Sequence, residues 1–272
     1  MSARIDLSGV GQVFQVRGDD DKQKRDFVAL EGVELSVAAG EFLTLVGPSG
    51  CGKSTILDLV GGLTKPTTGT VSVDGRQIVG PGPDRGVVFQ QYTLLPWRTA
   101  LGNIEFALEA TGSWSRSERA ARAHDYLRLV GLEEFANRYP HELSGGMKQR
   151  IAIARSLSYE PAVLLMDEPF GALDAQTRER LQEELIEIWR RTGTTIVFIT
   201  HDIEEAVFLG QRVAVMSSRP GTIRTVIDIE LDHSRSGEED IRGTQEFAAY
   251  RHEIWSLLRE RQHGREEVAS VA

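Results

Sequence analysis

The chain contains one segment whose residue types and spacing suit the binding of phosphate groups. Residues 47–54 read Gly-Pro-Ser-Gly-Cys-Gly-Lys-Ser and match the pattern G-x-x-x-x-G-K-[ST] in full. The glycines let backbone N–H groups curve around a phosphate, Lys53 reaches the β- and γ-phosphates, and the Ser54 hydroxyl can ligate Mg²⁺. The alternative is a glycine-rich turn without a ligand. We predict that this phosphate loop binds a nucleotide through Gly47, Pro48, Ser49, Gly50, Cys51, Gly52, Lys53, Ser54 and the adjacent Thr55.

A second set of reactive side chains, Asp167 and Glu168, follows the apolar run Val163–Met166. An acid at the end of a buried strand is costly unless it faces a site. Asp167 can hold the hydration shell of Mg²⁺, and Glu168, which points elsewhere, can polarise an attacking water. Taken alone, the two acids could equally cap a helix. Because the chain also has a phosphate loop, we predict that Asp167 contributes to a Mg²⁺ site and that Glu168 is the catalytic base.

A third segment, Leu143–Arg150, reads Leu-Ser-Gly-Gly-Met-Lys-Gln-Arg and is called the signature segment below. Ser144 is a good helix N-cap, and Gly145 and Gly146 expose backbone N–H groups at the start of the helix. Capping alone accounts for Ser144 but not for both glycines, because glycine is unfavourable inside a helix. The pattern therefore predicts a second cradle for an anion.

The elements that position these segments alternate between strands and helices. A short apolar run at 42–46 predicts a buried strand before the phosphate loop, and a helix is predicted from Lys53 to Val60. Further strands are predicted at 4–16, 33–37, 71–73, 87–89, 162–166 and 195–199, and helices within 102–132 and at 177–191. This rhythm favours a parallel α/β sheet with a helical insertion.

Two polar stretches interrupt this pattern. The charged stretch 18–26 is predicted to be a solvated loop between strands. Residues 232–244 form a polar connector, and the helix after it is amphipathic. We expect that helix to pack onto the protein's own core through Phe247, Tyr250, Ile254, Leu257 and Leu258.

The composition is that of a globular protein of one large or two small domains. The chain has 272 residues, of which 40% are hydrophobic and 26% charged. A net charge of −9 argues against a dedicated nucleic-acid binder. The single cysteine, Cys51, is compatible with a reducing compartment. With neither a signal-like start nor an apolar run of about 18 residues, we expect a soluble, cytoplasmic protein.

These segments together resemble the nucleotide-binding subunit of ABC transporters. The resemblance rests on the phosphate loop, the acidic residues, the signature segment, Gln90 after Val-Val-Phe, Ala172-Leu-Asp174 and His201, in that family's order, and it covers about Ile5 to Pro220. Segments 89–97, 167–177 and 217–221 are similar to the nitrate/sulfonate/taurine importer branch. Met147 replaces the glutamine of many ABC proteins, but that branch often has methionine, so no loss of activity is expected.

The resemblance implies a fold and a domain division. The fold would be α/β: a RecA-like P-loop NTPase core with an N-terminal antiparallel β part and a helical insertion at about 92–160. The ABC ATPase domain would span residues 1–230. Residues 231–272 would form the polar connector and the C-terminal amphipathic helix.

The resemblance also implies residue roles. Gln90 would sense Mg²⁺ and the γ-phosphate, Asp174 would lie at a dimer interface, and His201 would contact the γ-phosphate. Considered alone, His201 is more often a core histidine, but its place after the strand that follows the acidic residues favours the functional role. An aromatic ring would stack on adenine, with Phe14 as the first candidate and Phe27 as the second. Ser144, Gly145 and Gly146 would complete the site of ATP and Mg²⁺.

The activity implied is ATP hydrolysis by a head-to-tail homodimer at the cytoplasmic face of the inner membrane. Its partners would be separate membrane permease subunits and, indirectly, a solute-binding protein, for uptake of a sulfonate, taurine or nitrate. The alternative is a soluble ABC ATPase that acts on nucleic acid or the ribosome. One phosphate loop, a short interval between Gln90 and Ser144, and the acidic net charge argue against it. A P-loop kinase or GTPase would lack the signature segment.

Cys51 has no required role in the loop, which uses backbone N–H groups. Its position near Lys53 and a helix start is expected to lower its pKa and make the thiol reactive.

Overall fold

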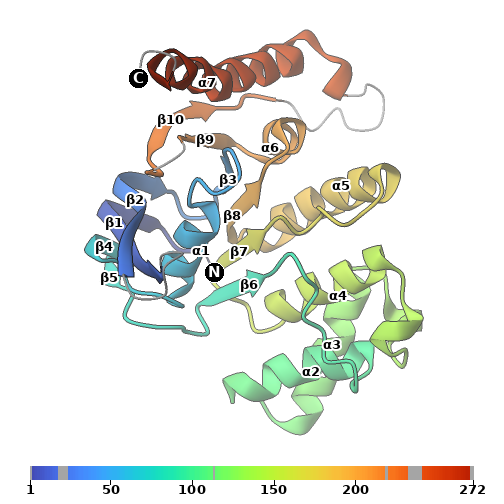
Figure 1. The fold of residues 1–272 in the computed structure, drawn as a ribbon. Helices are drawn as coiled ribbons and strands as arrows, with labels where there is room; N and C mark the ends of the chain where they lie inside the picture. Colours follow the sequence, from blue (N-terminus) through green and yellow to red (C-terminus); the bar gives the residue numbers. More distant parts are fainter. Residues whose placement is uncertain (1, 18–23, 113, 218–219, 232–240, 270–272) are drawn as a thin grey trace. The chain divides into compact units, whose positions relative to one another are not determined.

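The computed structural model describes residues 2–17, 24–112, 114–217, 220–231 and 241–269. Figure 1 shows the chain as a ribbon, coloured along the sequence. The chain divides into two compact units. Unit 1 comprises Met1–Ala3 and Pro81–Ile196, and unit 2 comprises Arg4–Gly80 and Val197–Ala272. Among the described residues, no helix has the length and apolar character needed to cross a membrane.

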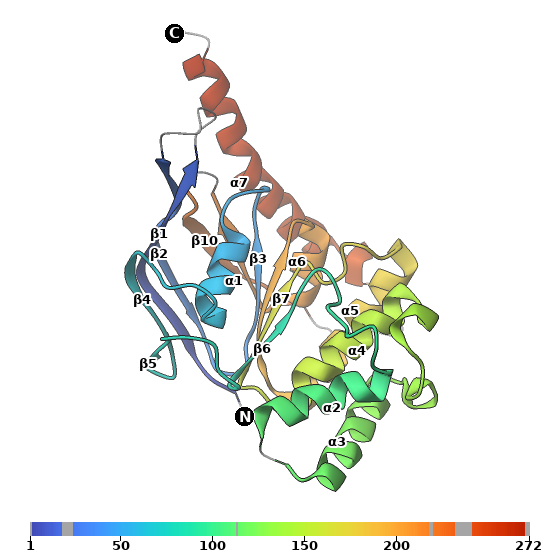
Figure 2. The ribbon, with the colours of Figure 1, turned by 60° about the horizontal axis from the view of Figure 1, so that its bottom comes forward.

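Unit 2 contains an antiparallel sheet in the order β2-β1-β4-β5. Its strands are β1 (Ile5–Arg17), β2 (Lys24–Val37), β4 (Thr68–Val73) and β5 (Arg76–Gln77). The pairs Ile5↔Val37 and Arg17↔Lys24 mark the two ends of the β1–β2 ladder, which forms a long ribbon (Figure 2).

The predicted loop at 18–26 is wrong at its C-terminal end, because Lys24–Asp26 belongs to β2. These residues pair with the end of β1, so the ladder continues through polar sequence. The side chains of Arg25 and Asp26 are exposed, which is why charged residues are tolerated in this part of the strand. Residues 18–23 lie outside the described part.

The rest of unit 2 is built on parallel strands, in the order β10-β9-β3-β8. The strands are β3 (Phe42–Val46), β8 (Thr195–Thr200), β9 (Arg212–Met216) and the antiparallel edge strand β10 (Ile223–Asp228). Leu43 of β3 pairs with Arg212 of β9. All five residues of β3 are buried, as the apolar run predicted. Helix α1 (Lys53–Gly61) follows β3, and α6 (Ile203–Leu209) follows β8.

Unit 1 holds the start of β8 and the parallel pair β6 (Arg85–Val88) and β7 (Val163–Asp167). Its helices are α2 (Ala100–Thr111), α3 (Arg116–Leu129), α4 (Gly145–Leu157) and α5 (Ala175–Thr192), with short 3₁₀ turns at Glu133–Phe135 and Pro140–Glu142. Helix α2 packs against both α3 and α4, as Figure 2 shows. These three helices lie within the stretch 92–160.

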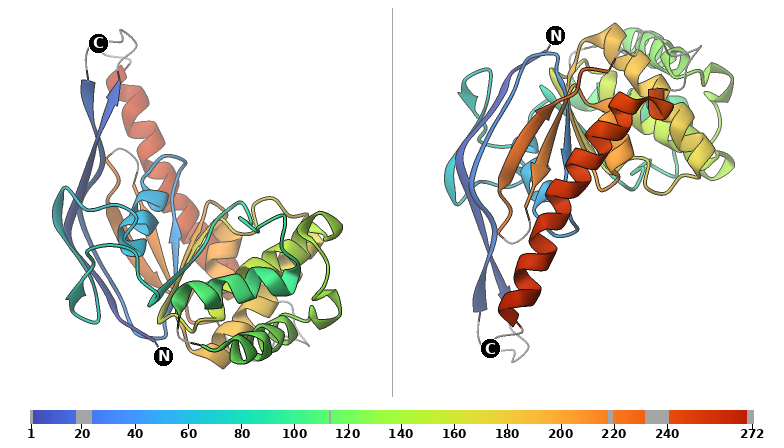
Figure 3. Two further views of the ribbon diagram at one scale, coloured as in Figure 1. Left: turned by 90° about the horizontal axis from the view of Figure 1, so that it is seen from below. Right: turned by 90° about the horizontal axis from the view of Figure 1, so that it is seen from above.

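The last helix, α7 (Gln245–Ala269), belongs to unit 2 and lies alongside α6 and β9 (Figure 3). It is preceded by a 3₁₀ turn at Ile241–Gly243, and connector residues 232–240 lie outside the described part. Phe247 and Ile254 are fully buried, while Tyr250, Leu257 and Leu258 are half-buried. The amphipathic pattern therefore marks the face that α7 packs onto unit 2.

Candidate functional site

The phosphate loop connects β3 to α1, in the strand–loop–helix arrangement that the sequence predicts. Gly50 and Gly52 have positive φ angles of 74° and 97°, which favour glycine. A Cβ at Gly52 would also lie 2.5 Å from the Cδ2 atom of Leu30. No acidic residue lies in the first turn of α1. The positive end of this helix is therefore open to an anion.

Lys53 lies inside the loop with its side chain almost fully buried. Its Nζ donates hydrogen bonds to the Gly47 carbonyl at 2.8 Å and to the Pro48 carbonyl at 3.2 Å. Both carbonyls are neutral, so these bonds orient the ammonium group without cancelling its charge. A buried cation held in this way can bind phosphate oxygens strongly, because charge-assisted hydrogen bonds are the strong ones.

Cys51 does not behave as the sequence suggested. Its side chain is 1% exposed, and this burial raises the pKa of the thiol above its ordinary value despite the nearby charge of Lys53. The prediction of a lowered pKa is therefore wrong. The sulfur fills the space beside Gly47, where an added Cβ would lie 2.8 Å from Sγ. Cys51 is thus a small packing residue of the loop.

Phe14 and Phe27, the two candidates for the adenine contact, are direct partners across the β1–β2 ladder. Directly opposed residues of an antiparallel pair project to the same face. The two side chains are 37% and 38% exposed. Further along β2, Leu30 reaches the phosphate loop at Gly52. The two phenylalanines are therefore neighbours on one surface of unit 2.

We expect Phe14→Ala and Phe27→Ala each to weaken ATP binding about tenfold. Stacking of a base on an aromatic side chain contributes about 1 to 3 kcal/mol, and each substitution removes one ring from the shared surface. Calorimetric titration with ATP and, separately, with inorganic triphosphate measures the effect. Triphosphate binding should not change, because it lacks the base. Wild-type ATP affinity in both single variants would exclude these rings as the adenine contact.

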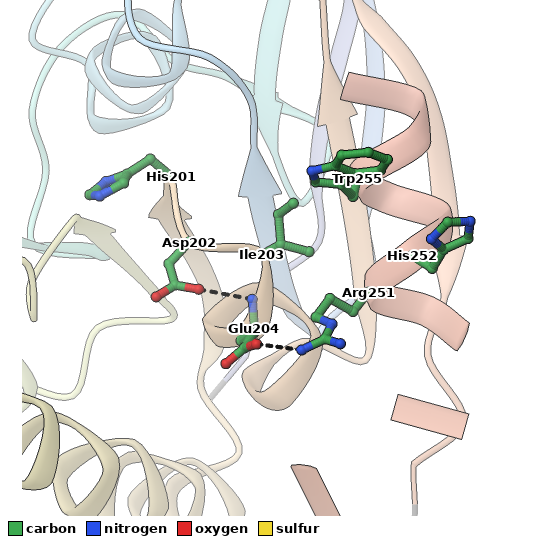
Figure 4. A pocket seen from close by; sticks show the side chains of 7 residues that line it. All are labelled: His201, Asp202, Ile203, Glu204, Arg251, His252 and Trp255. Carbon is green, nitrogen blue, oxygen red and sulfur yellow. Dashed lines mark hydrogen bonds and ion pairs between the residues drawn. The ribbon is translucent and has the colours of Figure 1, made fainter. Parts of the chain in front are cut away.

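His201 lies at the end of β8, immediately before α6, and its side chain is exposed. The next residue, Asp202, caps α6 by accepting hydrogen bonds from the N–H groups of Glu204 at 2.9 Å and Glu205 at 3.3 Å. Figure 4 shows His201 on the turn that leads into this capped helix. The imidazole is therefore carried by a turn whose backbone is fixed by the helix cap.

In unit 1, Asp167 ends β7 and Glu168 follows it, both half-buried. Glu168 has a φ of 42°, in the left-handed region that non-glycine residues rarely adopt. Such strained residues cluster at functional sites. Its carbonyl accepts a hydrogen bond from the N–H of Gly171 at 3.1 Å. The chain therefore turns sharply at Glu168, directly after the end of β7.

Gln90 comes after β6 and lies beside this acidic turn. An ideal Cβ built on Gly171 would be 3.8 Å from the Gln90 Nε2 and 3.4 Å from the Glu168 carbonyl oxygen. The structure thus brings Gln90 and the turn at Glu168 together within unit 1, although they are far apart in the sequence.

The signature segment starts α4. Ser144 is the N-cap, and its hydroxyl accepts a hydrogen bond from the Met147 N–H at 3.3 Å. No acidic residue occupies the first turn. The arrangement has the open, positively polarised helix start that the sequence predicted, and the side chain of Ser144 is exposed there.

The two glycines of α4 are also required by close packing, a role that does not follow from the sequence pattern. A Cβ at Gly145 would lie 3.0 Å from the Tyr92 hydroxyl oxygen and 3.2 Å from a Leu173 methyl group, and one at Gly146 would lie 2.8 Å from a Thr177 methyl group. This contact could not be predicted from the residue types of its partners, which are Tyr92, Leu173 and Thr177. Anion binding is therefore not the only reason for glycine at these positions.

Asp174 caps α5 at the same place. Its Oδ1 accepts a hydrogen bond from the Thr177 N–H at 3.0 Å, which holds the pKa of the carboxyl below its ordinary value. Because Thr177 also packs against Gly146, the starts of α4 and α5 are in contact within unit 1.

The predicted site residues thus form two groups. Unit 2 holds the phosphate loop, the two phenylalanines and His201, and unit 1 holds Gln90, Asp167, Glu168, Asp174 and the signature segment. A phosphate loop between a parallel strand and a helix, in a chain with acids at the end of another parallel strand, defines a P-loop nucleoside triphosphatase.

Comparison with known proteins identifies the family. The model of the ABC transporter family matches residues 30–171. The nitrate import ATP-binding protein NrtD of Synechocystis sp. is 53% identical over 249 residues, which cover 90% of this chain and 92% of that protein. The taurine import ATP-binding protein TauB of Rhizobium johnstonii is 47% identical over 249 residues, with the same coverage. The chain belongs to the ABC transporter family and is one of its ATP-binding subunits.

Solved structures confirm the fold. A dimeric ATP-binding cassette, MJ0796, in a post-hydrolysis state bound to ADP and phosphate, has a TM-score of 0.71 and 36% sequence identity. The match covers 83% of this chain and 99% of that one. The α/β fold of an ABC ATPase, expected from the sequence, is therefore confirmed, as is the resemblance to the nitrate and taurine importers.

Proposed function

We propose that this chain is the ATPase of an importer for a small anionic or zwitterionic solute of the nitrate, sulfonate or taurine type. It converts ATP and water to ADP and phosphate, and separate membrane permease subunits carry the solute. The relatives named for nitrate and taurine import support this solute class. We place the subunit at the cytoplasmic face of the inner membrane as a peripheral protein, with the solute-binding protein as an indirect partner and no nucleic acid.

One observation carries the proposal: two helix starts of the chain, those of α1 and α4, each follow a glycine-containing segment of the anion-binding type, one for each half of an ATP site. The start of α1 follows the phosphate loop in unit 2, and the start of α4 follows Ser144 in unit 1. The phosphate loop already surrounds the phosphates of its own nucleotide. A two-fold dimer in which each loop faces the partner's signature segment uses both starts. The dimeric cassette structures support a dimer. In our proposal this dimer is arranged head to tail, with Asp174 at its interface.

In the proposed mechanism, hydrolysis depends on Glu168, in the turn that follows β7. The Glu168 carboxylate accepts a proton from water as the water oxygen attacks the γ-phosphorus, and ADP leaves with the electron pair of the broken P–O bond. Lys53 and His201 stabilise the charge on the γ-phosphate oxygens. Gln90, which lies beside the turn at Glu168, orients the attacking water. Positioning and electrostatic stabilisation carry most of this catalysis.

The donor set fits Mg²⁺. Ser54 offers a hydroxyl, Gln90 an amide oxygen and Asp167 a carboxylate, and Mg²⁺ prefers such oxygen ligands together with phosphates and water. Within the part of the chain that the structure describes, no group of three or more His, Cys, Asp or Glu side chains is arranged to hold a metal. A site that depends on the nucleotide's own oxygens agrees with this. Ser54, Gln90 and Asp167 would hold Mg²⁺ when it is bound, and the metal would neutralise part of the phosphate charge.

The surface of unit 1 supports a permease partner. Trp97 is 70% exposed, and Phe89 and Phe106 are also exposed. Arg98, next to Trp97, lies over the Phe106 ring at 5.0 Å from its centre. Large exposed aromatic side chains are typical of protein interaction sites.

Copurification of the chain tests the importer function against the alternative. We expect it to copurify with an integral membrane protein, and copurification with nucleic acid or ribosomes instead would contradict the importer function.

Cysteine crosslinking tests the dimer directly. In a Cys51→Ser background, one chain carries Ser49→Cys and a differently tagged chain carries Ser144→Cys. Both positions are exposed. With a non-hydrolysable ATP analogue, we expect a disulfide between the two chains. A control with Ser117→Cys, on the exposed face of α3, should not crosslink. If 49 and 144 crosslink only when placed in the same chain, the head-to-tail arrangement is excluded.

A further inference from the structure

The turn that carries His201 is fixed by the start of α6. The Asp202 N–H donates to the Thr200 hydroxyl at 3.0 Å, and the Asp202 carboxylate caps α6. Because both neighbours of His201 take part in these hydrogen bonds, the direction of the imidazole depends on where α6 begins.

Helix α6 has only seven residues. Helices this short are not stable alone and take their position from packing. Helix α6 packs on β3 and β9, and the Thr44 hydroxyl of β3 donates a hydrogen bond to the Ala206 carbonyl at 3.1 Å. On its other side, Arg242 lies over the Phe208 ring at 3.8 Å, and Phe247 and Ile254 of α7 are fully buried. The C-terminal segment is therefore part of the support of α6.

One contact reaches the first turn of α6 itself. Arg251 of α7 forms an ion pair with Glu204 at 2.8 Å, across a cavity of about 680 Å³ that is lined by both helices. Figure 4 shows this pair beside the turn that carries His201, with Trp255 on the same side of α7. The pair is half exposed, and such ion pairs add little to global stability. The effect of the ion pair is instead local, because it links α7 to Glu204, whose backbone N–H donates to the capping residue Asp202.

We propose that Arg251 is a positioning residue for ATP hydrolysis: through Glu204 it sets the start of α6 and so aims His201 at the γ-phosphate. The inference rests on the proposed role of His201. Its consequence is that the C-terminal helix influences the rate of hydrolysis although it contains none of the proposed site residues, and that ATP binding at the phosphate loop does not depend on it.

Steady-state ATPase assays on the full-length chain test the proposal. We expect Arg251→Gln and Glu204→Gln each to lower kcat about two- to fivefold, the effect that an exposed ion pair can supply, with little change in KM for ATP. The charge-exchanged double variant, Glu204→Arg with Arg251→Glu, should regain most of the lost kcat. The matched control is Arg259→Gln: Arg259 is on the same helix but lies over the Trp255 ring at 4.7 Å.

A double-mutant cycle separates positioning from a general structural effect. In a His201→Ala background, Arg251→Gln should cause no further loss of kcat, because the group that it positions is gone. An equal loss in both backgrounds, or wild-type kcat for Arg251→Gln when His201→Ala is slow, would overturn the inference and leave the proposed function standing. If His201→Ala itself has wild-type kcat, the proposed role of His201 fails, and the inference fails with it.

Discussion

Chains with Glu168→Gln are expected to bind ATP as the wild type does and to hydrolyse it about 10²- to 10⁴-fold more slowly, the usual contribution of a positioned base. Glutamine has nearly the same size as glutamate but cannot accept the proton of the attacking water. Since Glu168 is at a strained φ of 42°, a residue of the same shape also preserves the turn. Phosphate release under single-turnover conditions measures the rate.

The same variant should form a stable dimer with ATP, because in the proposed head-to-tail dimer the γ-phosphate links the two chains and is not removed. Light scattering or size-exclusion chromatography with ATP and Mg²⁺ detects this dimer. The matched control is Glu183→Gln, on the exposed side of α5, which should behave as the wild type. Hydrolysis by Glu168→Gln at the wild-type rate would show that another group is the base.

Removal of the Lys53 ammonium group is expected to weaken ATP binding at least about tenfold and to abolish turnover. Hydrogen bonds to charged groups contribute about 1.5 to 3 kcal/mol, and the Lys53 ammonium group is held by two neutral carbonyls, those of Gly47 and Pro48. Lys53→Met keeps most of the buried stem and loses only the charge, while Lys53→Ala loses both. If charge is the cause, the two variants should have the same defect.

Calorimetric titration and a phosphate-release assay measure the two effects, and a thermal melt reports any loss of stability from the shortened side chain. Lys65→Ala, just beyond α1, is the control for the loss of a nearby positive charge. Undiminished steady-state ATPase activity in Lys53→Met would rule out the role of this ammonium group.

The sequence predicted the elements whose residues carry their own signal. Strand β3 was predicted over Phe42–Val46 because a continuous apolar run marks a buried strand, and α1 begins at Lys53 because the phosphate loop fixes its start. The boundary of β2 was missed because pairing with β1, not residue type, extends the strand to Lys24. In sequence, charged residues on an exposed part of a β-strand cannot be distinguished from the charged residues of a loop.

Properties that depend on neighbours distant in sequence could not be predicted. The pKa of Cys51 was given the wrong direction because its burial depends on contacts made by the folded loop. The choice between Phe14 and Phe27 stayed open because the charged stretch between them makes the alignment with the family uncertain. That the two residues pair across the ladder is known only from the structure. The packing of Gly146 against Thr177 likewise follows only from the approach of α4 to α5.

The pairing of β3 with β9 has a consequence for how the chain is made. The antiparallel pair β1–β2 is complete early in translation, but Leu43 meets its partner Arg212 only near the end. At about 5–20 residues per second, β3 waits roughly 10 to 30 s for the strands that flank it. An apolar strand with open edges is a template for aggregation during that time. Chaperone dependence should therefore be greatest in nascent chains that stop before β9, whatever their affinity for ATP.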